Sequence, residues 1–379
     1  MSVQNPKEYN RSNSREYLRQ STIQPSANFK LKRQVFSEDG KLQLLTLREL
    51  TGYEEEFIYR LMNSETGANN ETSNRYFSSS DKNIYEDGYR IDNLRLFRST
   101  NKILARTVSN MDELGYFGQL LSSSDSHENT TEYDVSRLVI PNLTLGEKNM
   151  ALLLLRKLTL GDKLILLTNC PYCKEKMTQV VSISKLIRSE LDRKIDVTNE
   201  QGRCGARDVT IMNDQNGTEY KVKLRPMTVG DLHTIHGSIR EKKMEASYID
   251  NLGEDSMKRF VIERVIETNI LESIPSLPTN IYDKASSLAF RIMEELGELD
   301  PLSNIRFSIT CPVCNKNSVE DFYPEYFVFS EIADYHKKLE DDLNWIALHY
   351  GWSEQEIMEM AISKRKKYIK LINQIYSGE

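Results

Sequence analysis

The spacing of apolar residues predicts a mixture of strand and helix in the first half of the chain. Residues 42–47 carry leucines at largely alternating positions, which is typical of a half-buried strand. Leucines then recur at helical spacing after Thr144, and Gly161 is the expected end of that helix. The apolar run at 163–167 and the β-branched run at 178–184 predict two antiparallel strands joined by a tight turn.

A second region repeats this order of elements. Residues 220–224 predict a strand, residues 286–299 a helix and residues 304–309 a further strand. Sliding one region over the other aligns four apolar pairs: Leu155 with Leu296, Leu158 with Leu299, Leu164 with Ile305, and Leu166 with Phe307. We infer an internal duplication of a strand-helix-helix-strand-CPxC-strand unit, where CPxC is Cys-Pro-x-Cys. Chance similarity between short periodic runs is the alternative.

Three predicted helices begin with a capping box, in which a Ser or Thr and a Glu three residues later bond to the first free amides. The pairs are Thr51 with Glu54, Thr144 with Glu147, and Ser353 with Glu356. Thr228 follows the strand at 220–224 and is expected to cap a helix in the second region, as Thr51 does in the first. Gly351 is the expected end of a long C-terminal helix.

Polar stretches set the expected domain limits. We expect four segments: a flexible N-terminal arm at 1–40, a first unit at 41–200, a second unit at 215–326, and C-terminal helices at 327–379. Stretches rich in Asn, Ser and Thr at 63–83 and 122–132 are expected to be loops inserted into the first unit. The fold class is therefore predicted to be α+β, with two related units and a helical end.

Two CPxC sequences supply the strongest chemical signal in the chain. Each follows a predicted strand, and together they provide four thiols, those of Cys170, Cys173, Cys311 and Cys314. Two thiolates on one tight turn can bind a single ion at about 2.3 Å, and four sulfurs match the tetrahedral coordination of zinc. Residues 174–310 separate the turns, so a shared ion would join distant parts of the chain. We expect a closed, structural Zn²⁺ site.

The same cysteines allow two other interpretations. Free cysteines are readily buried as small apolar residues. Cys170-Pro171-Tyr172-Cys173 also resembles the redox dithiol of glutaredoxins, so a thiol-disulfide oxidoreductase using Cys170 and Cys173 is an alternative function. That chemistry requires the first thiolate at a helix N-terminus, and the β-branched residues that follow argue against such a helix. The fifth cysteine, Cys204, is interpreted as a spare thiol.

The sequence shows no set of residues typical of catalysis, which favours a binding protein over an enzyme. The 379-residue chain has a net charge of -6, which gives no global attraction for nucleic acid. We interpret the basic run Lys364–Lys367 as a solvated helix face, and His233 and His236 as surface or boundary residues. We identify no catalytic residues. The N-terminus lacks an apolar signal segment and charges interrupt the stretch at 151–167, so we expect a protein made in the cytoplasm without membrane insertion.

Several motifs in their order resemble a known protein family. Leu47–Glu56 reads Leu-Arg-Glu-Leu-Thr-Gly-Tyr-Glu-Glu-Glu, and Leu153–Asp162 reads Leu-Leu-Leu-Arg-Lys-Leu-Thr-Leu-Gly-Asp. With the two CPxC turns and the ending that starts Tyr350-Gly351-Trp352-Ser353-Glu354, this order is similar to baseplate-associated proteins of contractile phage tails and phage-tail-like extracellular injection systems. The pattern is similar to the baseplate hub subunit family of T-even phages and covers most of residues 41–374.

The resemblance implies a structural component of a baseplate rather than an enzyme. The partners it implies are other baseplate and hub proteins of the same particle, and the assembled particle is the expected final location. A baseplate or hub assembly chaperone, absent from the mature particle, is the alternative function of this kind.

Overall fold

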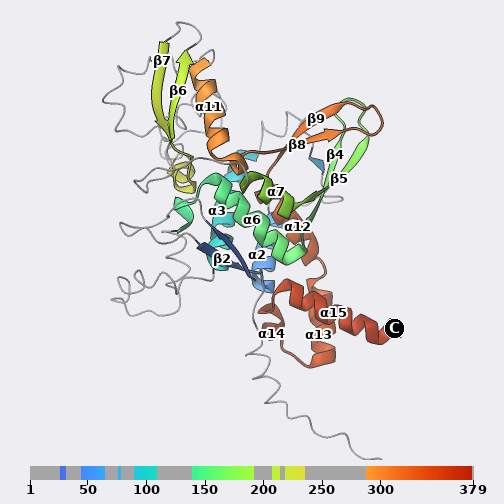
Figure 1. Ribbon diagram of the computed structural model, residues 1–379. Coiled ribbons are helices and arrows are strands. Elements are labelled where there is room, and N and C mark those ends of the chain that lie inside the picture. The colour runs from blue at the N-terminus through green and yellow to red at the C-terminus, as the bar shows by residue number, and fades with distance from the viewer. Residues whose placement is uncertain are drawn as a thin grey trace, which may run out of the picture.

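The structure is a computed structural model that describes residues 26–30, 44–64, 76–77, 89–108, 139–191, 207–213, 218–234 and 287–377. Within these ranges, helices and short pairs of strands alternate along the chain, so the fold is a mixed α+β arrangement. Figure 1 shows helices at the centre of the molecule, with the β4–β5 and β8–β9 hairpins beside each other at one end.

The described strands form small separate sheets, and most of their pairs are antiparallel. The antiparallel pairs are β1 (Ser26–Lys30) with β2 (Leu44–Arg48), β4 (Lys163–Asn169) with β5 (Lys176–Ser182), β6 (Arg207–Asn213) with β7 (Thr218–Leu224), and β8 (Ile305–Thr310) with β9 (Asn317–Phe322). A short strand, β3 (Tyr76–Phe77), lies parallel to β4.

The helices supply most of the packed core. They are α2 (Gly52–Ser64), α3 (Tyr89–Thr107), α6 (Leu145–Leu160), α7 (Ile183–Leu191), α11 (Ser287–Leu299), α12 (Pro324–His336), α13 (Leu339–Tyr350), α14 (Glu354–Met358) and α15 (Ile362–Ser377). Short 3-10 turns, η4 (Ile140–Asn142) and η7 (Pro301–Ser303), precede α6 and β8.

The core is built around α6, because this helix is apolar on most of its surface. Its Leu152 packs in one cluster with Ile58 of α2 and Phe329 of α12, and all three side chains are fully buried. Each such side chain contributes about 1.5–3 kcal/mol by leaving water. The central helix therefore links elements from the start, the middle and the end of the described chain.

A backbone bridge and a side-chain hydrogen bond at the start of α6 join it to the second region. The backbone of Thr144 pairs with that of Thr228, and the Leu145 amide donates to the Met227 carbonyl at 3.1 Å. The Asp300 carboxylate accepts from the Gly146 amide at 2.8 Å. An acidic group beside the first turn of a helix satisfies a free amide and interacts favourably with the helix dipole. Both contacts bring residues of the second region to the first turn of α6.

Several of the local signals at helix ends are confirmed. Capping boxes start α6 at Thr144 and α14 at Ser353, as expected from their glutamates. Gly161 and Gly351 follow the last residues of α6 and α13, and both have positive φ angles, 94° and 64°. The long C-terminal helix that we expected is instead two helices, α12 and α13, which a turn at residues 337–338 separates.

Two helix starts carry the same clamp of arginine, threonine and acid. In each, the arginine donates to the carboxylate and the threonine amide donates to that carboxylate at 2.9 Å. In each, the arginine also donates to the backbone carbonyl of the next residue, at 3.0 and 3.1 Å. The residues are Arg48, Thr51 and Glu54 before α2, and Arg225, Thr228 and Asp231 before the helical residues 229–234.

Two further expectations need correction. Ordered structure begins before residue 41, because β1 lies within the expected N-terminal arm and pairs along its whole length with β2. Backbone pairing stabilises a polar segment that composition alone assigns to a tail. Arg365, in the basic run expected to be a solvated face, is fully buried and pairs with Glu55 of α2. A run of lysines with a single arginine gives no local sign that the arginine has a partner 310 residues away.

Some expectations lie outside the described residues. They are the arm before residue 26, the expected loop at 122–132, Cys204 and His236. Of the expected loop at 63–83, the structure describes the last residues of α2 and the strand β3. No helix in the described ranges is long and apolar enough to span a bilayer.

Candidate metal centre

The first CPxC sequence forms the turn between β4 and β5. Cys170 donates its amide to the carbonyl of Glu175 at 2.8 Å, and the amide of Lys174 donates back to the Cys170 carbonyl at 2.9 Å. These two bonds close a tight loop around the thiols of Cys170 and Cys173. Lys174 has a φ of 63°, so the chain reverses through one left-handed residue just after the second cysteine.

The second CPxC sequence forms an equivalent turn between β8 and β9. The Cys311 amide donates to the Lys316 carbonyl at 2.9 Å, and the Asn315 amide donates to the Cys311 carbonyl at 3.0 Å. Asn315 has a φ of 55°, and asparagine is one of the few residues that adopt this region readily. The two turns therefore share their hydrogen bonds and the position of the left-handed residue.

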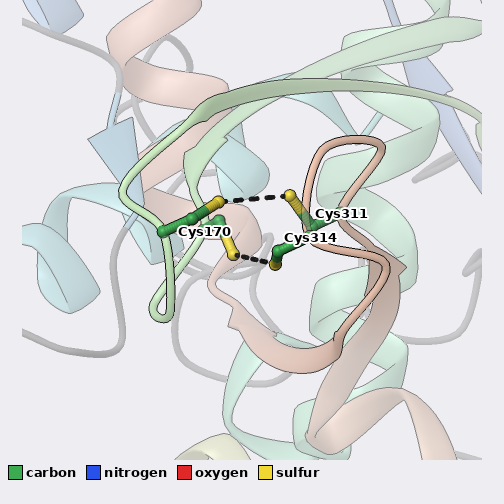
Figure 2. Close-up of side chains that lie close together, drawn as sticks. Cys170, Cys311 and Cys314 are labelled. Atoms are coloured by element: carbon green, nitrogen blue, oxygen red, sulfur yellow. Dashed lines mark hydrogen bonds between the residues drawn. The ribbon is translucent and has the colours of Figure 1, made fainter.

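The two turns bring four sulfurs together. Cys170 Sγ lies 3.6 Å from Cys314 Sγ, and Cys173 Sγ lies 3.6 Å from Cys311 Sγ. All four sulfurs lie within 4.8 Å of one another. A regular tetrahedron with metal–sulfur bonds of about 2.3 Å has edges of about 3.8 Å, so the cluster has the size that a tetrahedral ion requires. Figure 2 shows the side chains of the two turns pointing toward each other.

Burial differs between the first and second cysteines of each turn. Cys170 and Cys311 are buried, whereas Cys173 is exposed and Cys314 is partly exposed. Met177 of β5 and Ile309 of β8 pack in one cluster with the buried cysteines. The hairpins thus meet through an apolar base and present the outer sulfurs to solvent.

Hydrogen bonds adjust the thiol acidities unequally. The amide of Cys173, with smaller contributions from Tyr172 and the neighbouring thiols, lowers the pKa of Cys170 to about 6 against the opposing effect of desolvation. The pKa of Cys173 is raised to about 12, because desolvation and the other sulfurs outweigh the amide of Glu175. Four sulfurs this close cannot all ionise alone. A bound dication would supply the compensating charge, and its binding would release the remaining protons.

Each turn carries an exposed lysine. Lys174 and Lys316 are exposed, and the Lys316 ammonium lies 4.7 Å from the centre of the Tyr172 ring. A divalent ion with four thiolates carries a net charge of -2. Nearby lysines reduce the energy of that charge, which suits a dianionic metal centre.

The other histidine and cysteine features considered from the sequence lie as expected where the structure describes them. Within the described ranges, these four cysteines form the one group of cysteine, histidine or acidic side chains close enough to hold a metal. His233 is exposed after the helix start at Thr228. Cys173 is followed by strand β5 instead of a helix, so a thiolate at a helix N-terminus is missing.

Comparisons with known protein families, with curated proteins and with solved structures found no match.

Proposed function

We propose that Cys170, Cys173, Cys311 and Cys314 bind one structural Zn²⁺ ion and that this ion fastens the β4–β5 hairpin to the β8–β9 hairpin. The observation that carries the proposal is the group of four sulfurs, with two cross-turn separations of 3.6 Å. Tetrahedral sites of four sulfurs hold zinc or iron, and a closed zinc site of this kind stabilises a fold without catalysing a reaction.

The proposed ion joins two copies of one ancestral unit. In each region, a helix precedes the first strand of the hairpin (α6 or α11), and another follows the second strand (α7 or α12). Leu155 and Leu296, aligned from the sequence, are both buried, as are Leu164 and Ile305. The repeated clamps before α2 and before residues 229–234 support the same proposal. Such a duplication accounts for two matching turns that meet across the metal.

The larger role that we propose is a structural component of the baseplate of a contractile, phage-tail-like injection system. The resemblance of Leu47–Glu56, Leu153–Asp162 and the CPxC turns supports it, together with a site that has no open coordination position. The protein would act by binding other baseplate and hub proteins. An assembly chaperone, absent from the mature particle, fits the same residues.

A thiol-disulfide oxidoreductase is the second candidate, because the low pKa of Cys170 provides thiolate near neutral pH. Two features favour metal binding instead. The turn continues into β5 without a helix, and the second CPxC turn places Cys314 Sγ against Cys170. A redox dithiol has no need of a second, equivalent pair.

Elemental analysis of the purified protein tests the metal proposal. We expect about one zinc ion per chain, and expect Cys311→Ser to lose it, because three sulfurs leave the site open. Cys204→Ser removes the chain's other thiol and serves as the matched control, with metal content unchanged. Absence of metal in protein prepared without chelators would overturn the proposal, and iron in place of zinc would correct the identity of the ion.

Mass spectrometry of purified particles tests the larger role. A resident subunit is recovered in the particle in a fixed ratio to the other baseplate proteins. A chaperone is present in assembling cells and missing from finished particles. If the protein is found neither in finished particles nor in assembling cells, both roles are rejected, and the metal proposal remains.

A further inference from the structure

The end of the described chain carries apolar side chains that the fold leaves in solvent. On α13, Trp345 is 45% exposed and Leu348 77%. On α15, Leu371 is 40% exposed, Ile375 71% and Tyr376 66%. We call these five residues the C-terminal patch. Single exposed apolar residues are ordinary, whereas a group of large ones on adjoining helices marks an interaction site.

Ring contacts connect the two helices of the patch. The Trp345 and Tyr376 rings lie 5.7 Å apart in an edge-on arrangement, and the His349 ring stacks on Trp345. His349 also holds the Tyr376 hydroxyl at 2.7 Å from its Nε2 and the Trp345 carbonyl at 2.7 Å from its Nδ1. These contacts order the exposed rings, so a partner would meet a preformed surface with little loss of side-chain entropy.

The patch lies on a strongly basic helix. Between Ile362 and Ser377, α15 has five basic residues and no acidic one, although the whole chain has a net charge of -6. Arg365 forms an ion pair with Glu55, and Lys366 lies over the Tyr335 ring. Lys367 and Lys370 are exposed, and no carboxylate within the described ranges forms an ion pair with either. Positive charge therefore remains beside the patch.

The spacing on α15 fits a helical partner. Lys367, Leu371 and Ile375 follow one another at intervals of four residues, so they lie along one face. From Lys367 to Ile375 this face is about 12 Å long, at a rise of 1.5 Å per residue. A partner helix of three turns covers that length, with apolar residues against Leu371 and Ile375 and acidic residues against the lysines.

We propose that the C-terminal patch binds an acidic amphipathic helix of a partner protein. A second copy of this chain is disfavoured, because a symmetric contact would bring together two copies of a helix that has five basic residues and no acidic one. The inference rests on the proposed role as a structural baseplate component in one respect: the partner is taken to be a protein of the same assembly.

Figure 1 shows α13 and α15 at the opposite end of the molecule from the β4–β5 and β8–β9 hairpins. The patch and the candidate metal centre are therefore separate surfaces. One can be altered without touching the other, and this separation makes the two proposals independently testable.

The experiment uses the full-length protein and a fluorescein-labelled peptide of about 18 residues, a length at which helix begins to form in water. The peptide carries leucines at helical spacing and glutamates elsewhere. We expect fluorescence anisotropy to rise to saturation and to fall with added salt. The Lys367→Glu/Lys370→Glu and Leu371→Ser/Ile375→Ser variants should each bind at least about tenfold more weakly, a loss of 1.4 kcal/mol in binding free energy.

The matched controls are Lys185→Glu on α7 and Val180→Ser on β5, which alter equally exposed residues elsewhere. Both should bind within about twofold of the unaltered protein, since surface changes outside a contact have small effects. A peptide of the same composition with its leucines scattered should bind no better than background. Circular dichroism of each variant should keep the helical signal, because the altered side chains are exposed.

Four outcomes would overturn the proposal: no saturable binding, equal losses in the controls, sedimentation with phosphatidylserine vesicles in place of peptide binding, or a dimer that Leu371→Ser/Ile375→Ser dissociates. Elemental analysis of the same samples separates these outcomes from the metal proposal. One zinc ion per chain without peptide binding would reject the patch alone, and peptide binding without metal would reject the zinc site alone.

Discussion

Replacing Arg365 by methionine should strongly destabilise the attachment of the C-terminal helices. Arg365 and Glu55 are both 0% exposed, and they form an ion pair between α15 and α2. Asp342 of α13 adds a carboxylate 3.5 Å from Arg365 Nε. Removing one partner of a buried pair leaves an uncompensated charge and costs about 3–5 kcal/mol. We expect Arg365→Met to fall in that range.

The pH dependence of this loss has a predictable sign. Burial raises the pKa of Glu55, and Arg365 is the group that most opposes the rise. Without Arg365 the folded-state pKa of Glu55 rises further. A carboxyl whose pKa is raised on folding adds stability below its unfolded pKa and loses it as pH rises through the folded pKa. Arg365→Met should therefore be less destabilising near pH 5 than near pH 8.

Urea unfolding measured by tryptophan fluorescence is the assay, because both tryptophans of the chain, Trp345 and Trp352, lie in the C-terminal helical end. The double variant Glu55→Gln/Arg365→Met should lose less than the sum of the single losses, by about 0.5–3 kcal/mol. Lys367→Met, an exposed change on the same helix, should stay within about 0.5 kcal/mol of the unaltered protein. A loss below about 1 kcal/mol for Arg365→Met, or simple additivity, would refute the reasoning.

Two further predictions concern smaller features. Gly146→Ala should destabilise the protein by about 1–3 kcal/mol in urea unfolding, because an added Cβ would overlap the Asp300 carboxylate that caps α6. Gly297→Ala lies on a helix with open space at the Cβ position, so it should be neutral or stabilising by up to about 1 kcal/mol. A larger loss of stability in Gly297→Ala than in Gly146→Ala would contradict the packing of Asp300 against Gly146. The hydroxyls of Ser182 and Ser184 hold the pKa of Asp162 at about 2, so its contribution to stability should be lost as pH falls from about 4 toward 2. Carbon-detected NMR titration should give this pKa and a value nearer 3.8 in Ser184→Ala, and an unchanged value would argue against the hydrogen bond.

Features fixed by neighbouring residues could be predicted from the sequence. The capping boxes at Thr144 and Ser353 depend on a glutamate three residues away, and Gly161 ends its helix for local steric reasons. The strand, CPxC turn and strand around Cys170 are also local. Placing Cys170 beside Cys314 required one more step, which was to treat two equivalent turns as halves of one site.

Features that depend on distant partners could not be predicted in this way. Arg365 lies in a run of basic residues that is typical of a solvated face, and its partner Glu55 is far away in the sequence. Asp300 caps a helix that begins 155 positions earlier at Leu145, and it carries no local signal for that role. Strand β1 depends on pairing with β2, because its own composition is polar. Long-range contacts of this kind leave no periodic pattern in the segment that makes them.

X-ray absorption spectroscopy at the zinc edge tests the central claim most directly. If one ion is held by thiolates from both turns, the spectrum of the purified protein should show four sulfur neighbours at about 2.3 Å and no lighter neighbour. Replacing Cys173 and Cys314 by serine, one sulfur from each turn, should abolish the zinc signal. A first shell in the unaltered protein with fewer than four sulfurs, or with nitrogen or oxygen at about 2.0–2.2 Å, would contradict a shared four-cysteine site.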